Sequence, residues 1–583
     1  MANVNIKING KDVSVPEGST ILEAARLINI KIPTLCYLKG INEIGACRIC
    51  VTEVKGARSL VTSCVFPVRE GMEIITNSSR VIESRKKTLQ LLLSDHDKKC
   101  LSCIRSGSCE LQDLCNEYGV DDENYYAGST NKYELDYSAP HMVRDNNKCI
   151  LCRRCVAMCE KVQGIGVIGA NERGFTTHIS SAFEMGLGST SCVSCGQCIN
   201  VCPTGALYEQ DSSAGVIEAI ADPTKVVIVQ TAPAVRAALG EEFGYPIGTN
   251  VEGKMVSALR KIGFDKVFDT NFAADLTIME ESNEFLERVN NKGVLPLITS
   301  CSPGWIKYCE HYFPDMTENL SSCKSPQQMF GAIVKTYYAE KLKLDPKNIV
   351  SVSIMPCTAK KFEIGRDDQA ASGYADVDYS LTTRECARLI KKYGIDFNSL
   401  ADEEYDNPLG TSSGAAVIFG ASGGVMEAAL RTAVWKLTGE TDDSPIDFTE
   451  VRGMEGIKSA TYNVAGMDIK VAVASGLNNA KTLLEKVKSG EETYHFIEIM
   501  GCPGGCINGG GQPRVHADIL NSENVRILRA KALYSEDAAN EMRKSHDNPS
   551  IKKLYEEFLE KPGSHKAHEI LHTTYIKRKI NEN

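Results

Sequence analysis

The amino-terminal end of the chain alternates between apolar and polar residues in a way that predicts two short strands followed by a helix. Every second residue is apolar over 4–8 and again over 12–15, and this period of two is typical of strands. Apolar residues then recur at helical spacing over 19–27, where Thr20 and Glu23 fit a capping box. We therefore expect a small α+β domain here.

Two more segments precede the larger part of the chain. Residues 81–95 are amphipathic and carry Lys and Arg, most clearly at 85–93, which predicts a helix. Residues 118–140 are polar and rich in tyrosine, with the run 121–126 the most polar, and are expected to form a linker or surface loop.

Beyond residue 220 the pattern changes to short apolar runs separated by helical segments. The runs at 226–230, 294–299 and 349–355 have the length of buried strands, and 330–338 has a helical pattern. This alternation is typical of α/β layers with parallel strands, in which functional loops follow the carboxyl ends of strands. Cys301 and Cys357 directly follow two of the runs.

Length and charge limit the classes of protein that fit. The chain has 583 residues, and at about 150 residues per domain it should form roughly four units. Its net charge of −10 argues against nucleic-acid binding, which needs a basic face. The first residues resemble a strand rather than a signal peptide, and we see no long apolar span. We expect a cytoplasmic protein that does not bind a membrane.

The cysteines change this picture most. The chain contains 23 of them, many in CxxC runs, and in a large chain without a leader such runs indicate metal ligands rather than disulfides. Several metal clusters on one chain would carry electrons along it.

Two cysteine groups occupy the first part of the chain. One is spaced C-x10-C-x2-C-x13-C, which indicates a [2Fe–2S] cluster or a zinc site; the other is spaced H-x3-C-x2-C-x5-C and could hold zinc or a [4Fe–4S] cluster. The first group is Cys36, Cys47, Cys50 and Cys64, and the second is His96, Cys100, Cys103 and Cys109.

The most specific motif is a repeated bacterial ferredoxin run, in which the fourth cysteine binds the other cluster. One [4Fe–4S] cluster is therefore expected on Cys149, Cys152, Cys155 and Cys202, and a second on Cys192, Cys195, Cys198 and Cys159. Pro203 follows the second run, whereas Glu160 stands in the corresponding place of the first.

A last group lies in the carboxy-terminal half. Cys502 and Cys506 stand four residues apart in a segment rich in glycine, and glycine lets a backbone approach an inorganic group closely. With Cys301 and Cys357 they make four soft ligands, the number that a cubane iron–sulfur cluster needs.

Residues 299–305, 355–360 and 500–506 resemble the three signature segments of [FeFe] hydrogenases. The likeness runs nearly from end to end, and residues 36–114 also resemble complex I large subunits. It implies an H-cluster, which is a [4Fe–4S] cubane joined through one cysteine to a two-iron subsite with CO, cyanide and a dithiolate amine.

The resemblance also implies the domain organisation and the full set of cofactors. The implied fold is an α/β catalytic domain at 213–583, with the H-cluster between two lobes, preceded by three α+β iron–sulfur domains. These are a β-grasp [2Fe–2S] domain at 1–80, a His/Cys₃ [4Fe–4S] domain at 81–140 and a ferredoxin-like domain with two [4Fe–4S] clusters at 141–212. One [2Fe–2S] cluster, three accessory [4Fe–4S] clusters and the H-cluster follow from it.

The family's site residues carry over by position. Cys357, Cys502 and Cys506 would bind the cubane, with Cys506 bridging to the two-iron subsite. The pocket around that subsite would be lined by Ala232, Pro233, Gln327, Met355, Lys360, Phe419 and Met500.

One departure concerns the first signature, where the family usually has a cubane ligand and a proton donor as adjacent cysteines. Here Ser302 follows Cys301. We expect Cys301 to be the fourth cubane ligand and Ser302 or Cys323 to take part in proton delivery, although in the family's usual alignment the first cysteine is the donor.

The rest of the family's proton path maps onto Glu281, Glu284, Arg288 and Ser321. The first three of these lie on one face of a predicted helix, a spacing that suits a relay and equally suits a solvated surface.

The sequence also contains the letters of a second catalytic motif, without the further ligand that this motif needs. The segment 568–572 reads HExxH, the pattern of zinc proteases, but no later residue could act as the usual third ligand, so we interpret it as structural. Four cysteines stay unassigned: Cys115, Cys309, Cys323 and Cys386.

The resemblance predicts reversible hydrogen chemistry, with electrons moving through the accessory clusters. Expected partners are a flavoprotein that binds NAD(P)H, a small [2Fe–2S] subunit and ferredoxin, as in electron bifurcation. Two features favour them: residues 36–114 resemble the complex I large subunit, which docks on a flavoprotein, and Ser302 is a variant associated with multi-subunit members of the family. The chain has no GxGxxG fingerprint in a βαβ context, so flavin and nicotinamide would bind elsewhere. A stand-alone ferredoxin-dependent hydrogenase is the alternative. A non-catalytic H₂ sensor or iron–sulfur scaffold and a complex I-type electron-transfer subunit also remain open.

Overall fold

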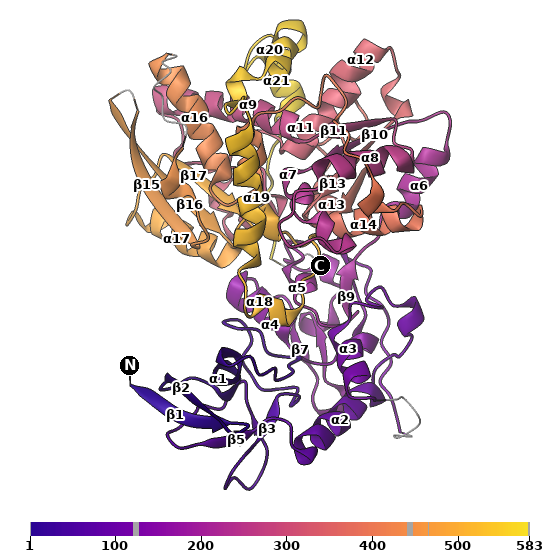
Figure 1. The fold of residues 1–583 in the computed structure, drawn as a ribbon. Helices are drawn as coiled ribbons and strands as arrows, with labels where there is room; N and C mark the ends of the chain where they lie inside the picture. The colour runs from indigo at the N-terminus through magenta and orange to yellow at the C-terminus, as the bar shows by residue number, and fades with distance from the viewer. Residues whose placement is uncertain (1, 121–127, 440–446, 465, 581–583) are drawn as a thin grey trace.

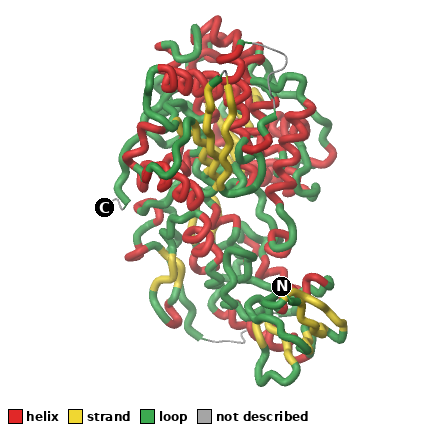
Figure 2. Tube along the Cα trace, turned by 90° about the vertical axis from the view of Figure 1, so that its left-hand side faces the viewer, coloured by secondary structure: helices red, strands yellow, loops and turns green. Residues whose placement is uncertain are grey.

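The computed structural model describes residues 2–120, 128–439, 447–464 and 466–580. The molecule is elongated, with small amino-terminal modules at one end and a larger carboxy-terminal part of two lobes at the other (Figure 1). The view turned by 90° shows the same long axis (Figure 2). Among the described residues, no helix is both long and apolar enough to cross a membrane.

The first module is a five-stranded sheet with one helix packed on it. Its strands are β1 (Asn3–Ile8), β2 (Lys11–Pro16), β3 (Val51–Val54), β4 (Val61–Thr62) and β5 (Glu73–Ile75), in the order β2-β1-β5-β3-β4. The parallel pairing of β1 with β5 gives it the β-grasp arrangement. Helix α1 (Ile21–Leu27) begins at the predicted capping box of Thr20 and Glu23, and its Ile21 and Leu22 pack into the module's core.

The second module contains α2 (Ser79–Ser94), close to the predicted bounds, and α3 (Glu110–Glu117). The predicted linker follows it, and its most polar run, 121–126, lies outside the described residues. Of the described part, residues 128–135 form neither helix nor strand.

The third module consists of two antiparallel strand pairs and two short helices. The strands β6 (Met142–Arg144) and β9 (Leu207–Glu209) pair, as do β7 (Gly169–Asn171) and β8 (His178–Ser180). The helices α4 (Arg154–Ala157) and α5 (Gln197–Asn200) contain Cys155 and Cys198, one from each cysteine run.

Each lobe of the carboxy-terminal part is built on a four-stranded sheet covered by helices. The first sheet is parallel and consists of β10 (Val226–Thr231), β11 (Lys266–Asp269), β13 (Ile349–Met355) and β14 (Tyr379–Thr382), in the order β11-β10-β13-β14. The runs predicted at 226–230 and 349–355 are thus strands. Helices α8 (Glu252–Ile262) and α14 (Thr383–Lys392) bury their apolar faces on this sheet.

The second sheet has the order β12-β17-β16-β15. It consists of β12 (Leu297–Ile298), β15 (Ile457–Val464), β16 (Met467–Ser475) and β17 (Phe496–Met500), and only β15 and β16 pair antiparallel. The run predicted at 294–299 is shorter as a strand than its apolar pattern, because only Leu297 and Ile298 pair with β17.

Long helices separate and cover the two sheets. These are α9 (Asn271–Asn290), α16 (Gly424–Thr438) and α19 (Val525–Ala539), and α19 runs between the lobes in Figure 1. The segment predicted as helix at 330–338 continues α11 (Pro326–Ile333) into a π-helical turn at Val334–Tyr338.

One buried carboxylate joins the third module to the first lobe. Glu209, at the end of β9, is fully buried. It accepts hydrogen bonds from Arg384 (2.9 Å) and Arg388 (2.6 Å) on α14 and from Arg514 (3.5 Å). Arg384 also donates to the carbonyl of Gly510 (2.7 Å), so this interaction fixes the third module against the glycine-rich segment.

We predict that Glu209→Gln destabilises this junction by about 3–5 kcal/mol, because removing one partner of a buried ion pair leaves the guanidinium groups without a compensating charge. Thermal unfolding followed by circular dichroism measures the effect. The control is Glu218→Gln, which changes an exposed carboxylate on α6 (Ser213–Ala221) and should leave the unfolding midpoint unchanged.

The pH dependence of this difference gives a second check. Burial opposes ionisation of Glu209, but the charges of Arg384, Arg514 and Arg388 hold its pKa well below its ordinary value. A lowered pKa contributes stability that is complete above the unfolded-state pKa of about 4.3 and is lost as the pH falls through the folded-state pKa. The difference between wild type and variant should therefore stay constant between about pH 6 and 8; a decline within that range would contradict the assignment.

Candidate metal centre

Three strands of the two lobes end at one place and bring the predicted thiols to it. Cys357 follows β13 of the first lobe, whereas Cys301 and Cys502 follow β12 and β17 of the second. Cys506 belongs to the same turn as Cys502. The sites at the ends of parallel strands thus combine across the two lobes, as the predicted fold class requires.

Glycine makes the close packing around these thiols possible. A Cβ added to Gly509 would lie 2.1 Å from the carbonyl oxygen of Pro356, and one added to Gly510 would lie 2.2 Å from that of Cys195. Gly505 has a φ of +99° and would place a Cβ 2.7 Å from the backbone nitrogen of Ser422. No other residue type fits these three positions without movement of backbone.

The donor set fits an iron–sulfur group. Burial raises the pKa of Cys357, raises that of Cys506 to about 12, and places those of Cys301 and Cys502 well above the ordinary value. Buried thiols of this kind lose their protons when a metal binds, and thiolate sulfur is the ligand that iron–sulfur clusters use. These residues would hold a cubane at the junction of the lobes.

The six residues predicted to line the two-iron pocket are all buried and come from both lobes: Ala232, Pro233, Gln327, Met355, Phe419 and Met500. Lys360, also buried, donates to the carbonyl oxygen of Cys301 (3.2 Å), to Ser325 (2.7 Å) and to Glu363 (2.8 Å). The structure therefore places a positive charge directly beside the first signature segment.

Two buried carboxylates near the site were not predicted from the sequence. Glu363 accepts hydrogen bonds from Lys360 and Gln327 (2.9 Å) and so orients both side chains. Glu498, on β17, accepts from the backbone N–H groups of Gly423 and Met426 (both 2.7 Å) at the start of α16. The spacing of Lys360 and Glu363 along one helix could have indicated the first; nothing in the sequence pattern indicates the second.

Of the residues predicted for the proton path, Glu284, Arg288 and Ser321 are joined by hydrogen bonds on α9 and the loop beside it. Glu281 is 1% exposed, which excludes the solvated-surface interpretation for this residue. Burial raises its pKa to about 8. Ser321 donates to Glu284 (3.0 Å), and Arg288 donates to the same carboxylate (2.6 Å). Glu284 and Arg288 are partly exposed, so the row leads from the interior towards solvent.

Cys301, Ser302 and Cys323 were the residues predicted to act as cubane ligand or in proton delivery, and the structure places them in different surroundings. Cys301 packs against the apolar cluster that contains Phe419 and Met500. The Ser302 hydroxyl accepts a hydrogen bond from the backbone of Gly501 (3.1 Å). Cys323 is fully buried in a different cluster, with its Sγ 3.9 Å from Glu284.

The eight cysteines of the third module enclose two cavities. One cavity is lined by Cys149, Cys152, Cys155 and Cys202, and the other by Cys159, Cys192, Cys195 and Cys198. These are the two sets expected from the crossed ferredoxin pattern, so the structure brings each set of four thiols together.

The first module brings its four cysteines together as two close pairs. The Sγ atoms of Cys50 and Cys64 are 3.2 Å apart, and the backbone of Cys47 donates to Cys36 Sγ (3.5 Å). Two thiols for each iron suit a [2Fe–2S] cluster.

The second module contains the predicted ligands His96 and Cys109 and the unassigned Cys115. Cys109 and Cys115 are buried in one cluster with Leu111, which makes the unassigned Cys115 part of an apolar core. Nδ1 of His96 is buried and has no hydrogen-bond partner among the described residues. An unpaired buried imidazole nitrogen fits a ligand position, but the described contacts do not place it against the cysteines.

The HExxH segment spans the end of a helix and the residue after it. Helix α21 (His565–Leu571) ends before His572, whose ring contacts Ser322 (2.8 Å) and Glu280 (3.2 Å). His572 thereby fixes the carboxy-terminal segment beside the loop of the proton path, a contact that the sequence alone did not indicate.

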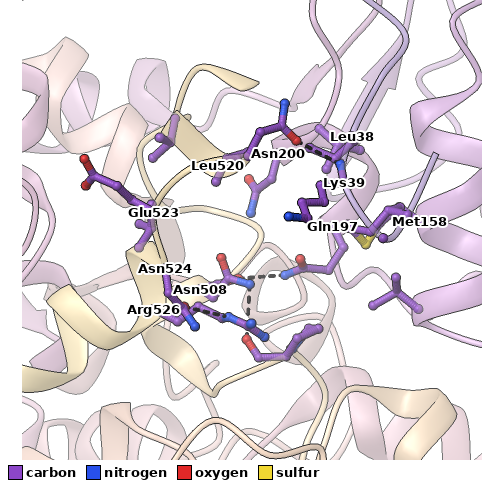
Figure 3. A pocket seen from close by; sticks show the side chains of 18 of the residues that line it. Leu38, Lys39, Met158, Gln197, Asn200, Asn508, Leu520, Glu523, Asn524 and Arg526 are labelled. Carbon is purple, nitrogen blue, oxygen red and sulfur yellow. Dashed lines mark hydrogen bonds between the residues drawn. The ribbon is translucent and has the colours of Figure 1, made fainter. Parts of the chain in front are cut away.

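A cavity of about 520 Å³ lies where the first and third modules meet the carboxy-terminal part (Figure 3). Amide groups connect the parts here: the backbone of Lys39 donates to Asn521 (2.8 Å), and Gln197 donates to the carbonyl of Asn508 (2.8 Å). None of the four thiols described above lines it, so this cavity is separate from the metal centre.

Comparison with known families assigns nearly every part of the chain. Residues 225–510 match the iron only hydrogenase large subunit, C-terminal domain, and 523–578 match the iron hydrogenase small subunit. The amino-terminal matches are a 2Fe-2S iron-sulfur cluster binding domain (1–79), the NADH-ubiquinone oxidoreductase-G iron-sulfur binding region (85–124) and a 4Fe-4S dicluster domain (148–206).

Individual relatives agree with these matches. The chain is 53% identical to the NADP-reducing hydrogenase subunit HndD of Solidesulfovibrio fructosivorans, covering 99% of this chain and 100% of that protein. It is 43% identical to iron hydrogenase 1 of Clostridium pasteurianum, covering 98% and 100%. An apo variant of the [FeFe]-hydrogenase HydA1 from Chlamydomonas reinhardtii is 42% identical with a TM-score of 0.57, covering 64% of this chain and all of that one. The chain therefore belongs to the iron-only, or [FeFe], hydrogenase family and is a hydrogenase with accessory iron–sulfur domains.

Proposed function

We propose that the chain interconverts H₂ with two protons and two electrons at an H-cluster held between its two lobes, as one subunit of an NAD(P)-linked complex. The observation that carries this proposal is the proximity of Cys301, Cys357, Cys502 and Cys506, from both lobes, to one another and of Cys301 to the buried carboxyl of Glu281. Soft ligands for iron and a proton carrier thus lie within one interior site.

We infer a complement of one [2Fe–2S] cluster, three accessory [4Fe–4S] clusters and the H-cluster. The paired thiols of the first module and the two four-thiol cavities of the third support three of the accessory centres. The fourth, on His96, Cys100, Cys103 and Cys109, rests on the motif and on the unpaired nitrogen of His96.

The bound H-cluster would supply the bond making and breaking, and the chain's residues would supply ligands, cavity and proton path. Cys357, Cys502 and Cys506 would hold the cubane. Lys360 would provide a fixed positive charge at the first signature, where it already donates to the carbonyl of Cys301.

The proton would move between the site and solvent through the row on α9. Glu281 would receive or release it in the interior. Ser321, which acts on the Glu281 carboxyl, donates to Glu284, and Arg288 holds Glu284 by a hydrogen bond of 2.6 Å. General acid–base groups work best when their pKa lies near the working pH, and the value of about 8 for Glu281 satisfies this condition.

The similarity to HndD, whose name describes an NADP-reducing hydrogenase subunit, supports an NAD(P)-linked partner. Residues 85–124 also match a region of NADH-ubiquinone oxidoreductase. The run Gly164–Gly169 has the letters GxGxxG but follows a helix, and its last glycine begins β7, so it lacks the strand–loop–helix context of a dinucleotide site. Flavin and NAD(P)H would bind to a partner flavoprotein. Ferredoxin and a small [2Fe–2S] subunit would complete a cytoplasmic, electron-bifurcating complex.

We predict that Cys506→Ala abolishes H₂ turnover and leaves the amino-terminal clusters intact, because it removes the thiolate that would join cubane and two-iron subsite. Infrared spectra of the matured wild type should show CO and cyanide stretches, and the variant should lose them. Electron paramagnetic resonance of the accessory clusters is the control and should not change. Full H₂ activity in the variant would contradict the assignment.

We predict that Glu281→Gln lowers the rate of H₂ production by about 100-fold or more, in line with the loss of a general acid–base group. The CO and cyanide bands should keep their positions, since the amide has nearly the shape of the carboxyl. Glu287→Gln, an exposed position on the same helix, is the matched control and should keep wild-type activity. Equal loss in both variants would rule out a relay through Glu281.

The partner can be tested on the native protein. Anaerobic purification should yield a flavoprotein bound to this chain, and only the complex should reduce NAD(P)⁺ with H₂. If the chain purifies alone and exchanges electrons fully with ferredoxin, the stand-alone alternative is correct, and the hydrogenase activity itself is unaffected.

A further inference from the structure

A loop at residues 321–324 holds the outer carboxylate of the predicted proton path. The backbone N–H of Ser322 donates to both oxygens of Glu284 (3.0 and 3.2 Å), and the hydroxyl of Ser321 donates to one of them (3.0 Å). Two neighbouring serines of one loop thus orient this carboxylate. The position of Glu284 therefore depends on where the loop lies.

The segment after α21 pairs with this loop as a short antiparallel strand would. Helix α21 ends at Leu571, and the next residue is extended, with φ −110° and ψ +162°. The backbone N–H of Lys324 donates to the carbonyl oxygen of Leu571 (2.8 Å), and that of Thr573 donates to the carbonyl oxygen of Ser322 (2.8 Å). Two backbone hydrogen bonds therefore fix the loop along residues 571–578, which we call the carboxy-terminal strap.

Two side chains of the carboxy-terminal strap add contacts to the same loop. The His572 ring lies between Ser322 and Glu280: its Nδ1 is 2.8 Å from the Ser322 hydroxyl, and its Nε2 is 3.2 Å from the carboxylate. Glu280 belongs to α9 and is 1% exposed, so the ring is held from the helix side as well. Tyr575 donates its hydroxyl to the carbonyl oxygen of Ser321. Each of the two serines thus has its own partner in the strap.

The carboxy-terminal strap is anchored independently of the loop. Asp368 accepts a hydrogen bond from the backbone N–H of Thr574 (3.0 Å), and Arg366 donates to the carbonyl oxygen of the same residue (2.8 Å). Glu310, which is fully buried, accepts a hydrogen bond from the guanidinium of Arg578 (2.6 Å). Because these contacts do not involve the loop, the loss of one loop contact should shift the loop and leave the strap in place.

We propose that His572 and Tyr575 are positioning residues of the proton path, which hold the two serines of the loop on the carboxylate of Glu284. This inference rests on the proposed function. Both residues lie in the part of the chain, 523–578, that matches the iron hydrogenase small subunit. That part contains none of the expected cluster ligands, and the contacts of the strap give it a role in proton delivery. The last letter of the HExxH segment thereby has a function other than zinc binding.

Two substitutions separate the two contacts of the His572 ring. The amide of asparagine can reach the position of Nδ1, beside Ser322, whereas that of glutamine can reach the position of Nε2, beside Glu280. We expect His572→Gln to lower the rate of H₂ production by as much as about 100-fold, the loss that a misplacement of about 1 Å can cause. His572→Asn should retain most of the rate. The control is His565→Gln, an exposed position at the start of α21, which should keep the wild-type rate.

The second positioning residue is tested by Tyr575→Phe, which removes only the hydroxyl that reaches Ser321. Its rate should fall as well, whereas Tyr393→Phe, an exposed tyrosine at the end of α14, should match the wild type. In Tyr575→Phe and His572→Gln the ratio of the rates in H₂O and D₂O should rise, because proton delivery then limits turnover. Added imidazolium, a small diffusible acid, should restore part of the rate. A loss of stability alone would produce neither effect.

The loop can also be followed without H₂ activity. Hydrogen exchange at residues 320–325, measured by mass spectrometry on the full chain, should be faster in His572→Gln and Tyr575→Phe than in the wild type, because the Ser322 N–H loses its fixed acceptor. The CO and cyanide bands of the matured variants should keep their positions, since neither residue lies among the expected cluster ligands.

The outcomes distinguish this inference from the proposed function. Without CO and cyanide bands in the matured wild type, the proposed function fails and this inference fails with it. With the bands present, wild-type rates and isotope ratios in both His572→Gln and Tyr575→Phe would refute the positioning role alone. An equal loss of rate in His572→Asn and His572→Gln, together with a lowered iron content, would also overturn it, because the ring would then be needed only for folding.

Discussion

The structure depends on the close approach of two turns that carry cluster ligands. Gly196, beside Cys195, has a φ of +67°, and a Cβ there would lie 2.3 Å from Oγ1 of Thr358, beside Cys357. The same hydroxyl donates to the carbonyl of Ser194 (2.7 Å). Because glycine allows contact between the two turns, the last accessory cluster and the cubane would lie almost against each other. The fixed position of Glu209 against α14 holds the third module in this place.

The sequence predicted the parts of this arrangement that have a regular period or spacing. The capping box of Thr20, the strands β10 and β13 and the crossed cysteine sets of the third module all follow from local patterns. Domain order followed from the resemblance, because cysteine spacing is specific to each kind of cluster domain. In these places the local sequence alone determines the structure of the segment.

Contacts between distant segments could not be predicted in this way. Glu498 caps α16 from a strand more than seventy positions later in the chain, and His572 reaches Glu280 on α9. The orientation of Ser302 is of the same kind. Its hydroxyl would ordinarily cap its own helix, and it points to Gly501 only because β12 and β17 are neighbours in one sheet.

Electrons and protons would reach the site from different parts of the molecule. The ferredoxin-type module lies below the two lobes in Figure 1, and its Cys195 turn contacts the turn of Cys357. The proton row belongs to α9 within the lobes and ends at Arg288. A cluster needs dense, dry packing by thiols and glycine, whereas a proton path needs hydroxyl and carboxyl groups in hydrogen-bond contact.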